Sequence, residues 1–329
     1  MRHQVMKYLT VGLSISISFS LLAAPGNAQE LPPIYSNVPV QLAPASPIAT
    51  FPVNTFLENL AIDQAGVLYI TSHEDGKIIR LSQDGTSSIY ASAPGKVTGI
   101  TFAPDGKLLI TGWNAEQVSV ISQISPDGTV ETVATLPDAL FLNGITHLSN
   151  DRYLIADSYK GVIWEFDAAQ QKTRIWLEHP LLTRKSAEDP IPAVNGLKFF
   201  AGKLYASNTN RMLMLQIPID AQGEAGEPST LAEHVNIDDF AFDTEGNLYG
   251  ATHIYNSVIR LAPNGQITTI AQAAQGMTGS TAVAFGHTNG DRTALYVVTN
   301  GGMFLPPPTG VEPAYVVQLQ IGKPGAISD

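Results

Sequence analysis

The sequence predicts an all-β protein, a six-bladed β-propeller with four strands in each blade. One pattern returns six times along the chain, and each return holds several short apolar segments separated by turn residues. No stretch beyond the N-terminal region has a helical period of apolar residues. Short strands, four to a unit, at a period of about 40 to 45 residues are typical of propeller blades.

Each repeat opens with a polar or small residue, and apolar residues follow two and four positions later. The strands that follow are of the type Leu-Tyr-Ile, and pairs such as Asp75-Gly76 and Asn264-Gly265 mark the turns between them. The openings are spaced by 40, 45, 52, 43 and 43 residues, and they are Glu58, Thr98, Asn143, Asn195, Asp238 and Thr281.

The sixth repeat lacks a fourth strand, because the chain ends soon after Gln320. The segment 47–51 has the pattern of a fourth strand and stands before the first repeat. We therefore predict that this N-terminal strand pairs into blade six and closes the ring, which removes exposed sheet edges. The alternative is that 47–51 remains an unpaired leader.

The N-terminus has the pattern of an export signal. Arg2, His3 and Lys7 give a positive start, an apolar run extends over 8–22, and small residues end at Ala28. The alternative, a membrane anchor, has little support because the run is short and rich in serine. The sequence predicts a signal peptide over 1–28, an extended leader over 29–46 and the propeller over 47–329. The expected location is periplasmic or extracellular, without membrane insertion after signal removal.

Composition limits the partners of the chain. The net charge is −11, from 29 acidic and 18 basic residues, which argues against binding nucleic acid. There is no cysteine, so disulfides, thiolate metal sites and cysteine nucleophiles are excluded. We expect a small-molecule substrate, and the oligomeric state stays open.

The first residue of an inner strand lies beside the central channel of a propeller, so the six openings should converge. All six carry a side-chain oxygen. Several oxygen donors with about two negative charges are what hard divalent cations prefer. We predict that one divalent cation, calcium first and otherwise magnesium, manganese or zinc, is held by Glu58, Asn143, Asn195 and Asp238. The alternative is that these residues only form turns, which suits Asn-Gly but not glutamate.

In this register the chain resembles the family of regucalcin (senescence marker protein 30), the gluconolactonases and related lactonases, six-bladed propellers with a divalent ion in the channel. Glu58, Asn195, Asp238 and Asn143 match the family's metal residues. The ligand pattern is also similar to that of paraoxonases, which add the residue after the aspartate, here Asp239. The resemblance implies that Asp238 serves as general base, with Asp239 as the alternative, and it covers the chain from about Phe51.

The chain departs from that family at the substrate side. Phe141 stands where sugar lactonases have an arginine, and Thr98 stands where paraoxonases have a catalytic histidine. His73 and His253 fall between second and third strands, on the expected active face, and His253 is a candidate acid or base. Phe141, Trp113, Asp239 and His73 are candidate substrate contacts, and an apolar rim favours a hydrophobic substrate. The alternative for the histidines and aromatic residues is ordinary loop packing.

The sequence thus predicts an exported metal-dependent hydrolase of a lactone or related ester. Two alternatives stay open, a non-hydrolytic enzyme resembling strictosidine synthase, and a binding propeller with a purely structural metal. No nucleophile motif of the Gly-x-Ser-x-Gly type is present.

Overall fold

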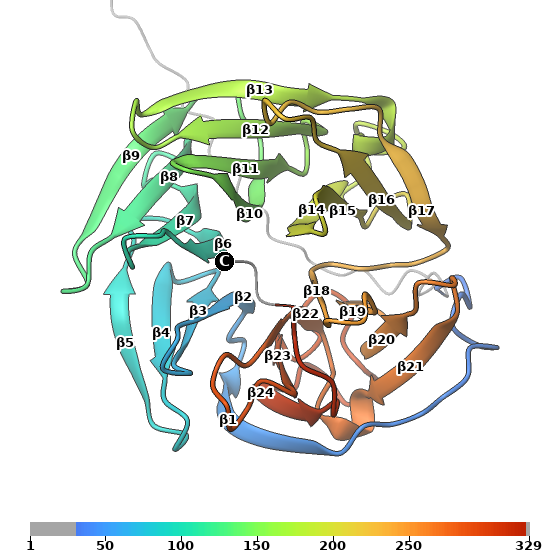
Figure 1. Ribbon diagram of the computed structural model, residues 1–329. Helices are drawn as coiled ribbons and strands as arrows, with labels where there is room; N and C mark the ends of the chain where they lie inside the picture. The colour runs from blue at the N-terminus through green and yellow to red at the C-terminus, as the bar shows by residue number, and fades with distance from the viewer. Residues whose placement is uncertain (1–30, 327–329) are drawn as a thin grey trace, which may run out of the picture. The chain divides into compact units, whose positions relative to one another are not determined.

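The computed structural model describes residues 31–326, so the predicted signal peptide over 1–28 lies outside the described residues. Within them, the chain forms six four-stranded antiparallel sheets arranged as blades around a common centre (Figure 1). The predicted six-bladed β-propeller is confirmed. Helical structure in the described residues is limited to two short 3₁₀ turns, η1 (Pro180–Leu182) and η2 (Ala273–Gln275).

The first strand of each blade is the innermost and the fourth lies at the rim. Blades one to three consist of β2 (Leu57–Ile62), β3 (Leu68–Ser72), β4 (Lys77–Leu81), β5 (Ser87–Ser92); β6 (Val97–Phe102), β7 (Leu108–Trp113), β8 (Ser119–Ile124), β9 (Val130–Leu136); β10 (Leu142–Ser149), β11 (Arg152–Asp157), β12 (Val162–Asp167) and β13 (Lys172–Glu178). Blades four to six consist of β14 (Val194–Phe200), β15 (Lys203–Asn208), β16 (Leu213–Pro218), β17 (Ser229–Glu233); β18 (Phe240–Phe242), β19 (Leu248–Ala251), β20 (Ser257–Leu261), β21 (Ile267–Gln272); β22 (Ser280–Phe285), β23 (Ala294–Thr299) and β24 (Pro313–Gln320), with β1 (Ala45–Val53).

The ring closes through the N-terminal strand, as predicted. β1 pairs antiparallel with β24 as the outer strand of blade six, with Ala45 opposite Leu319 and Phe51 opposite Ala314. The strand begins two residues before the predicted 47. The edge of β24 is therefore paired instead of being left to solvent.

The leader before β1 is also held by backbone hydrogen bonds. Gln41 and Ala43 donate to the carbonyls of Thr269 and Ile270 in β21, the outer strand of blade five. The segment predicted as an extended leader thus covers a second sheet edge before the chain enters blade six.

The apolar core lies between neighbouring blades, because each sheet buries both faces. At the closure, Leu60 and Ile70 of blade one pack with Val298 and Val316 of blade six. Between blades three and four, Leu154 and Ile163 are among the residues that pack with Leu197 and Leu215. Burying each such side chain contributes about 1.5 to 3 kcal/mol to folding, so blade-to-blade contact is a main source of stability.

Hydroxyl groups on second strands join neighbouring blades around the channel. Thr111 Oγ1 accepts from the backbone N–H of Gly99 (2.9 Å) in its own blade and donates to the carbonyl of Asn143 (2.7 Å) in the next. The same double contact recurs where Thr71 joins Asn59 to Thr98, and where Ser207 joins Gly196 to Asp238. We call these three hydroxyls the bridging hydroxyls. They fix the position of each inner strand relative to the inner strand of the next blade.

Replacing Thr111 by valine is expected to lower the free energy of unfolding by about 1 to 3 kcal/mol, because it leaves a buried N–H and a buried carbonyl without their partner. Urea denaturation of the purified protein measures this change. Thr135→Val, at an exposed position of outer strand β9, is the matched control. Equal stability of the two variants would contradict the role of the bridging hydroxyls.

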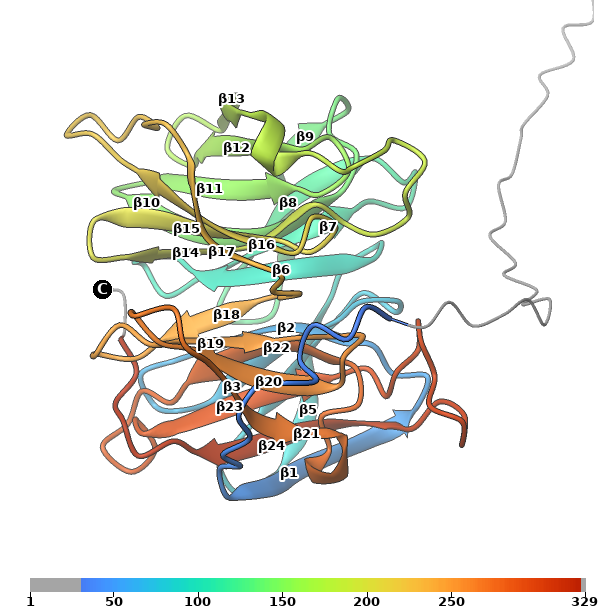
Figure 2. The ribbon, with the colours of Figure 1, turned by 90° about the vertical axis from the view of Figure 1, so that its right-hand side faces the viewer.

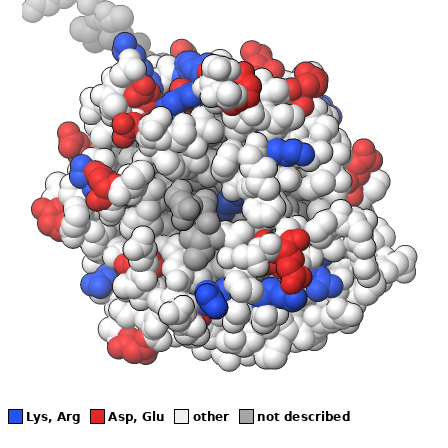
Figure 3. Space-filling view, viewed as in Figure 1, with Lys and Arg blue, Asp and Glu red and all other residues white. Residues whose placement is uncertain are grey.

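The two faces of the ring differ. On the face shown at the right of Figure 2, long loops emerge between β13 and β14 and between β23 and β24, and the inner strands begin there. We call this the loop face. Figure 3 shows the opposite face, where Lys, Arg, Asp and Glu side chains are scattered among uncharged residues. Within residues 31–326, no helix is long and apolar enough to cross a membrane.

Candidate functional site

The predicted metal residues stand at the same height on neighbouring inner strands at the loop face. Glu58, Asn143 and Asn195 are each the second residue of their inner strand, and Asp238 immediately precedes Asp239 at the start of blade five. All four are less than a tenth exposed. The common register confirms the repeat alignment from which they were predicted.

Three of these residues are directly linked by hydrogen bonding or charge. The Nδ2 of Asn195 donates to Oδ1 of Asp238 and to Oγ1 of Thr209 (3.2 Å). The other polar atom of the Asn195 amide, its own Oδ1, therefore remains for a ligand. Glu58 Oε2 is buried without any hydrogen-bond partner in the described structure. Burial, and then the charges of Asp238 and Asp239, raise the pKa of Glu58 well above its usual value.

The backbone of Asn143 is fixed by a hydrogen bond from the neighbouring blade. Its carbonyl accepts from the bridging hydroxyl of Thr111 at 2.7 Å, which fixes the start of β10. The side chain is 2% exposed, at the position equivalent to Asn195 in the next blade.

His253 contacts the candidate metal residues through Asp238. Its Nδ1 lies 2.9 Å from Oδ2 of Asp238. The backbone of His253 has a φ of 43°, a left-handed value that costs a non-glycine residue about 1 to 2 kcal/mol. Its N–H donates to the carbonyl of Ser280 at 2.8 Å, so the next blade helps to hold this turn.

Asn300 determines which ring nitrogen of His253 carries the proton. The Oδ1 of Asn300 accepts from the backbone N–H of Gly302 (2.9 Å), so its Nδ2 is the donor to Nε2 of His253 (2.8 Å). Nε2 is then the acceptor, and Nδ1–H donates to Asp238. The sequence prediction missed Asn300. Asn300 directly follows the second strand of its blade, as His73 does in blade one. Its backbone N–H donates to the carbonyl of the residue before the inner strand, and the N–H of His73 does the same. This common position in the repeat could have identified Asn300 from the sequence.

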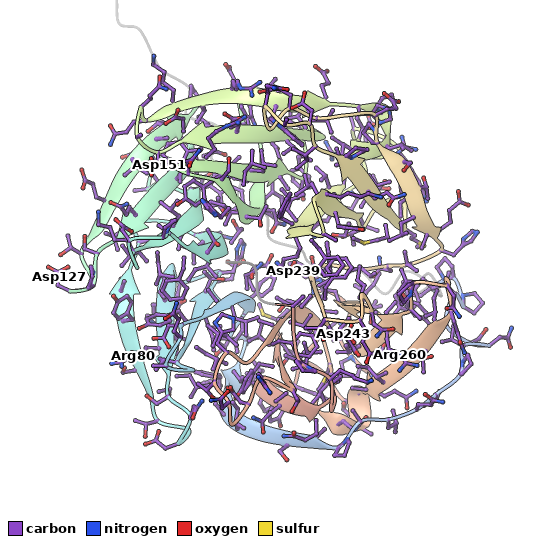
Figure 4. The ribbon with its side chains drawn as sticks, viewed as in Figure 1. Arg80, Asp127, Asp151, Asp239, Asp243 and Arg260 are labelled. Atoms are coloured by element: carbon purple, nitrogen blue, oxygen red, sulfur yellow. The ribbon has the colours of Figure 1, made fainter. Side chains whose placement is uncertain are left out.

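Asp239 is paired with a lysine. Lys198 Nζ from inner strand β14 lies 2.7 and 2.8 Å from its two oxygens. A Cβ at Gly196 would come within 2.5 Å of Asp239 Oδ1, so glycine is required there for this carboxylate to fit. Figure 4 shows Asp239 near the centre of the ring, whereas Arg80 and Asp127 lie at its outer part. With its charge neutralised by Lys198, Asp239 can contact a substrate at lower electrostatic cost than an unpaired acid.

The two threonine openings do not present free hydroxyls to the channel. Thr98 Oγ1 donates to the carbonyl of Leu142, and Thr281 Oγ1 donates to that of Leu57, both at 2.7 Å. They add to the contacts between blades. Both threonines still stand at the register of the other openings, as the second residues of β6 and β22.

Three of the four predicted substrate contacts lie together on the loop face, namely His73, Trp113 and Phe141, whereas the fourth, Asp239, pairs with Lys198. The rings of Trp113 and Phe141 are 5.0 Å apart, and Trp113 is 6.0 Å from His73. His73 Nδ1 is 2.7 Å from the carbonyl of Val97, which holds the ring in place, and burial lowers the pKa of His73. His147 instead packs on Tyr153 and bonds the Asn150 carbonyl, which fits a structural role.

The donor set fits one hard cation in its chemistry. Glu58 and Asp238 supply two carboxylates, Asn143 and Asn195 supply amide oxygens, and Glu58 Oε2 lacks a partner that a cation would provide. The described residues contain no group of three or more His, Cys, Asp or Glu side chains arranged for a metal ion.

Comparison with known proteins supports the fold. No family model matches the sequence. A protein from a Phoma species, described as a candidate hetero-Diels-Alderase, is 23% identical over 299 residues, covering 76% of this chain and 85% of that protein.

Two solved structures illustrate the structural likeness. The calcium-binding protein regucalcin from Agrobacterium tumefaciens superposes with a TM-score of 0.69 and 15% identity, over 88% of this chain and 98% of that one. A gluconolactonase from Xanthomonas campestris gives a TM-score of 0.63 and 14% identity, over 86% and 90%. These neighbours are the propellers that the sequence resembles, so the resemblance is confirmed at the level of the fold.

Proposed function

We propose that the protein is an exported, divalent-metal-dependent hydrolase of a lactone or related ester with a hydrophobic substrate. The observation that carries this proposal is the buried Glu58 carboxylate, whose Oε2 lacks a partner beside Asp238 and Asp239. A bound cation would give this oxygen a partner and would offset the repulsion among the neighbouring carboxylates. The structural likeness to a calcium-binding propeller and to a gluconolactonase supports the same choice.

In this mechanism Glu58, Asn143, Asn195 and Asp238 would hold the cation. When bound, the cation polarises the ester carbonyl and stabilises the charge that develops on its oxygen. Asp238 accepts a proton from the attacking water, and the water oxygen forms the new bond to the carbonyl carbon. The ester C–O bond then breaks, and the same proton passes to the leaving oxygen, which gives a carboxylic acid and an alcohol.

His253 orients the base in this scheme. Its Nδ1–H donates to Asp238 Oδ2, while Asn300 occupies its Nε2. The ring therefore holds the carboxylate in a fixed direction. It also stabilises the negative charge that Asp238 must keep in order to accept a proton.

A metal-dependent hydrolysis screen on the chain from residue 29 tests the proposal. Lactones and aryl esters are assayed in chelator and with calcium, magnesium, manganese or zinc, with Asp238→Ala as the control. We expect turnover that requires a cation and is lost in the variant. Turnover that is unaffected by chelator would contradict the metal-dependent mechanism.

A second candidate is a non-hydrolytic enzyme. The Phoma relative is described as a candidate hetero-Diels-Alderase, a catalyst of a cycloaddition, and it matches most of the propeller. No hydrolysis, together with a cation-dependent rise in melting temperature, would favour this candidate or a binding propeller.

A further inference from the structure

The site is bordered on one side by a continuous series of aromatic rings from four different blades. Neighbouring ring centroids are 5.0 to 6.0 Å apart, mostly edge to face or tilted. We call this series the aromatic arc, and in order it consists of Phe304, Phe56, His73, Trp113, Phe141 and Tyr159.

The inner end of the arc meets the proposed catalytic residues. Phe304 lies 5.6 Å from His253, and Phe56 lies 6.2 Å from it, both as ring centroids. Phe56 also stands two residues before Glu58 in the chain. A ligand group at Asp238 is thus next to the first rings of the arc.

The far end of the arc stops at a positive charge. The Arg184 guanidinium stacks on Tyr159 at 4.6 Å, and its nitrogens donate to the backbone carbonyls of Asp189 and Tyr159. The charge of Arg184 has an electrostatic effect on the Glu188 carboxylate. Among the described residues, however, no acidic side chain forms an ion pair with Arg184. The two ends of the arc therefore differ in charge, with acidic groups at Glu58 and Asp238 and a cation at Arg184.

Exposed apolar side chains gather along the same face. Phe304 is 62% exposed, and Leu140 beside Phe141 is 55% exposed. Ile191 and Leu305 add to this surface from the loops before β14 and before β24. Such side chains on the loops of one face favour contact with an apolar ligand. Aromatic rings favour flat π-systems, because edge-to-face and offset contacts add about 0.5 to 1.5 kcal/mol each beyond area burial.

We propose that the arc binds the body of an elongated aromatic ester or lactone, whose carbonyl lies at Asp238 and whose far end carries an acidic group that pairs with Arg184. This inference rests on the proposed function for the reacting carbonyl, while the arc and its terminal charge give the substrate class. Phe56 and His73 are buried, and a compact sugar lactone would leave the partly exposed rings of Trp113, Phe141 and Tyr159 uncovered.

Binding of hydrolysis-resistant probes tests the inference separately from turnover. The probes are δ-lactams, in which nitrogen replaces the ring oxygen. They are dihydroquinolinone, its benzo-fused analogue, and an aliphatic δ-lactam with nine carbons to match dihydroquinolinone. Calorimetric titration with calcium present is expected to show about tenfold tighter binding of dihydroquinolinone than of the aliphatic probe, and tighter binding again of the fused one.

Matched variants assign the preference to the arc. Trp113→Leu and Phe141→Leu keep an apolar side chain, and we expect them to remove most of the aromatic preference. Leu231→Ala, an exposed apolar position on outer strand β17, should leave it unchanged. Equal affinity for aromatic and aliphatic probes, or a preference that survives both leucine variants, would overturn the proposal.

The charged end has its own test. A carboxylate joined to the far ring of the fused probe by alkyl tethers of increasing length is expected to improve binding about tenfold over its methyl ester once the tether spans the arc, and Arg184→Gln should abolish that gain. No gain from the carboxylate, or a gain that persists in the variant, would refute the assignment of Arg184. If aromatic probes bind as expected while no ester is hydrolysed, the arc stands and the hydrolase proposal fails. Hydrolysis without aromatic preference would show the reverse.

Discussion

Replacing Glu58 by glutamine is expected to reduce cation-dependent turnover at least about 100-fold, and to leave the cation-free protein no less stable than the parent. The two effects have one cause. Glu58 Oε2 is buried without a hydrogen-bond partner, close enough to Asp238 and Asp239 for their charges to act on it. A neutral amide removes that repulsion, but it also removes one of the two carboxylates that a divalent cation needs.

Thermal unfolding with and without calcium measures both effects. The parent should gain stability with calcium, by about 2.7 kcal/mol at a concentration 100 times the dissociation constant. Glu58→Gln should gain little at the same concentration, while in chelator it should melt at or above the parent's temperature. Glu131→Gln, at an exposed position in outer strand β9, is the control for losing one negative charge. An equal calcium-dependent gain in Glu58→Gln and the parent would exclude Glu58 as a ligand.

Replacing His253 by alanine is expected to lower kcat about 100-fold while the dissociation constant of the cation changes less than about threefold. The ring does not belong to the proposed ligand set. It acts on Asp238 through its Nδ1–H at 2.9 Å, and Asn300 holds the other ring nitrogen. Losing the ring frees the carboxylate to rotate, so the loss should appear in the chemical step.

Steady-state kinetics and calorimetric cation titration together check this result. His147→Ala is the control, since His147 packs on Tyr153 and takes no part in the site. A His253→Ala variant with the parent's kcat would return His253 to a packing role. A large loss of cation affinity in the same variant would instead make it a metal ligand.

The sequence was sufficient to predict the fold and the common position of the candidate site residues in their inner strands, because both follow from the repeat. The register that aligns Glu58, Asn143, Asn195 and Asp238 is the register of the inner strands themselves. Ring closure by β1 followed from a missing fourth strand in the last repeat. Both follow from periodicity, which can be recognised in a single sequence.

The contacts between blades could not be predicted in the same way. Lys198 and Asp239 are 41 residues apart, and His253 and Asn300 are 47 apart, and no period relates their side chains. Thr98 and Thr281 matched the repeat as oxygen donors, yet a carbonyl of the next blade accepts each hydroxyl. Such pairings depend on how closely two blades approach, which is a three-dimensional property that spacing does not express.

The pairing of β1 with β24 has a consequence for folding kinetics. Ala45 and Leu319 lie opposite each other although they are far apart in sequence. Blades one to five each pair strands that are close in sequence, so each closes at a small cost in loop entropy. Blade six has to join two distant segments, and we therefore expect its closure to be the slowest step of ring formation. Until that step is complete, the molecule keeps an open sheet edge and an exposed apolar side, through which partly folded copies can associate.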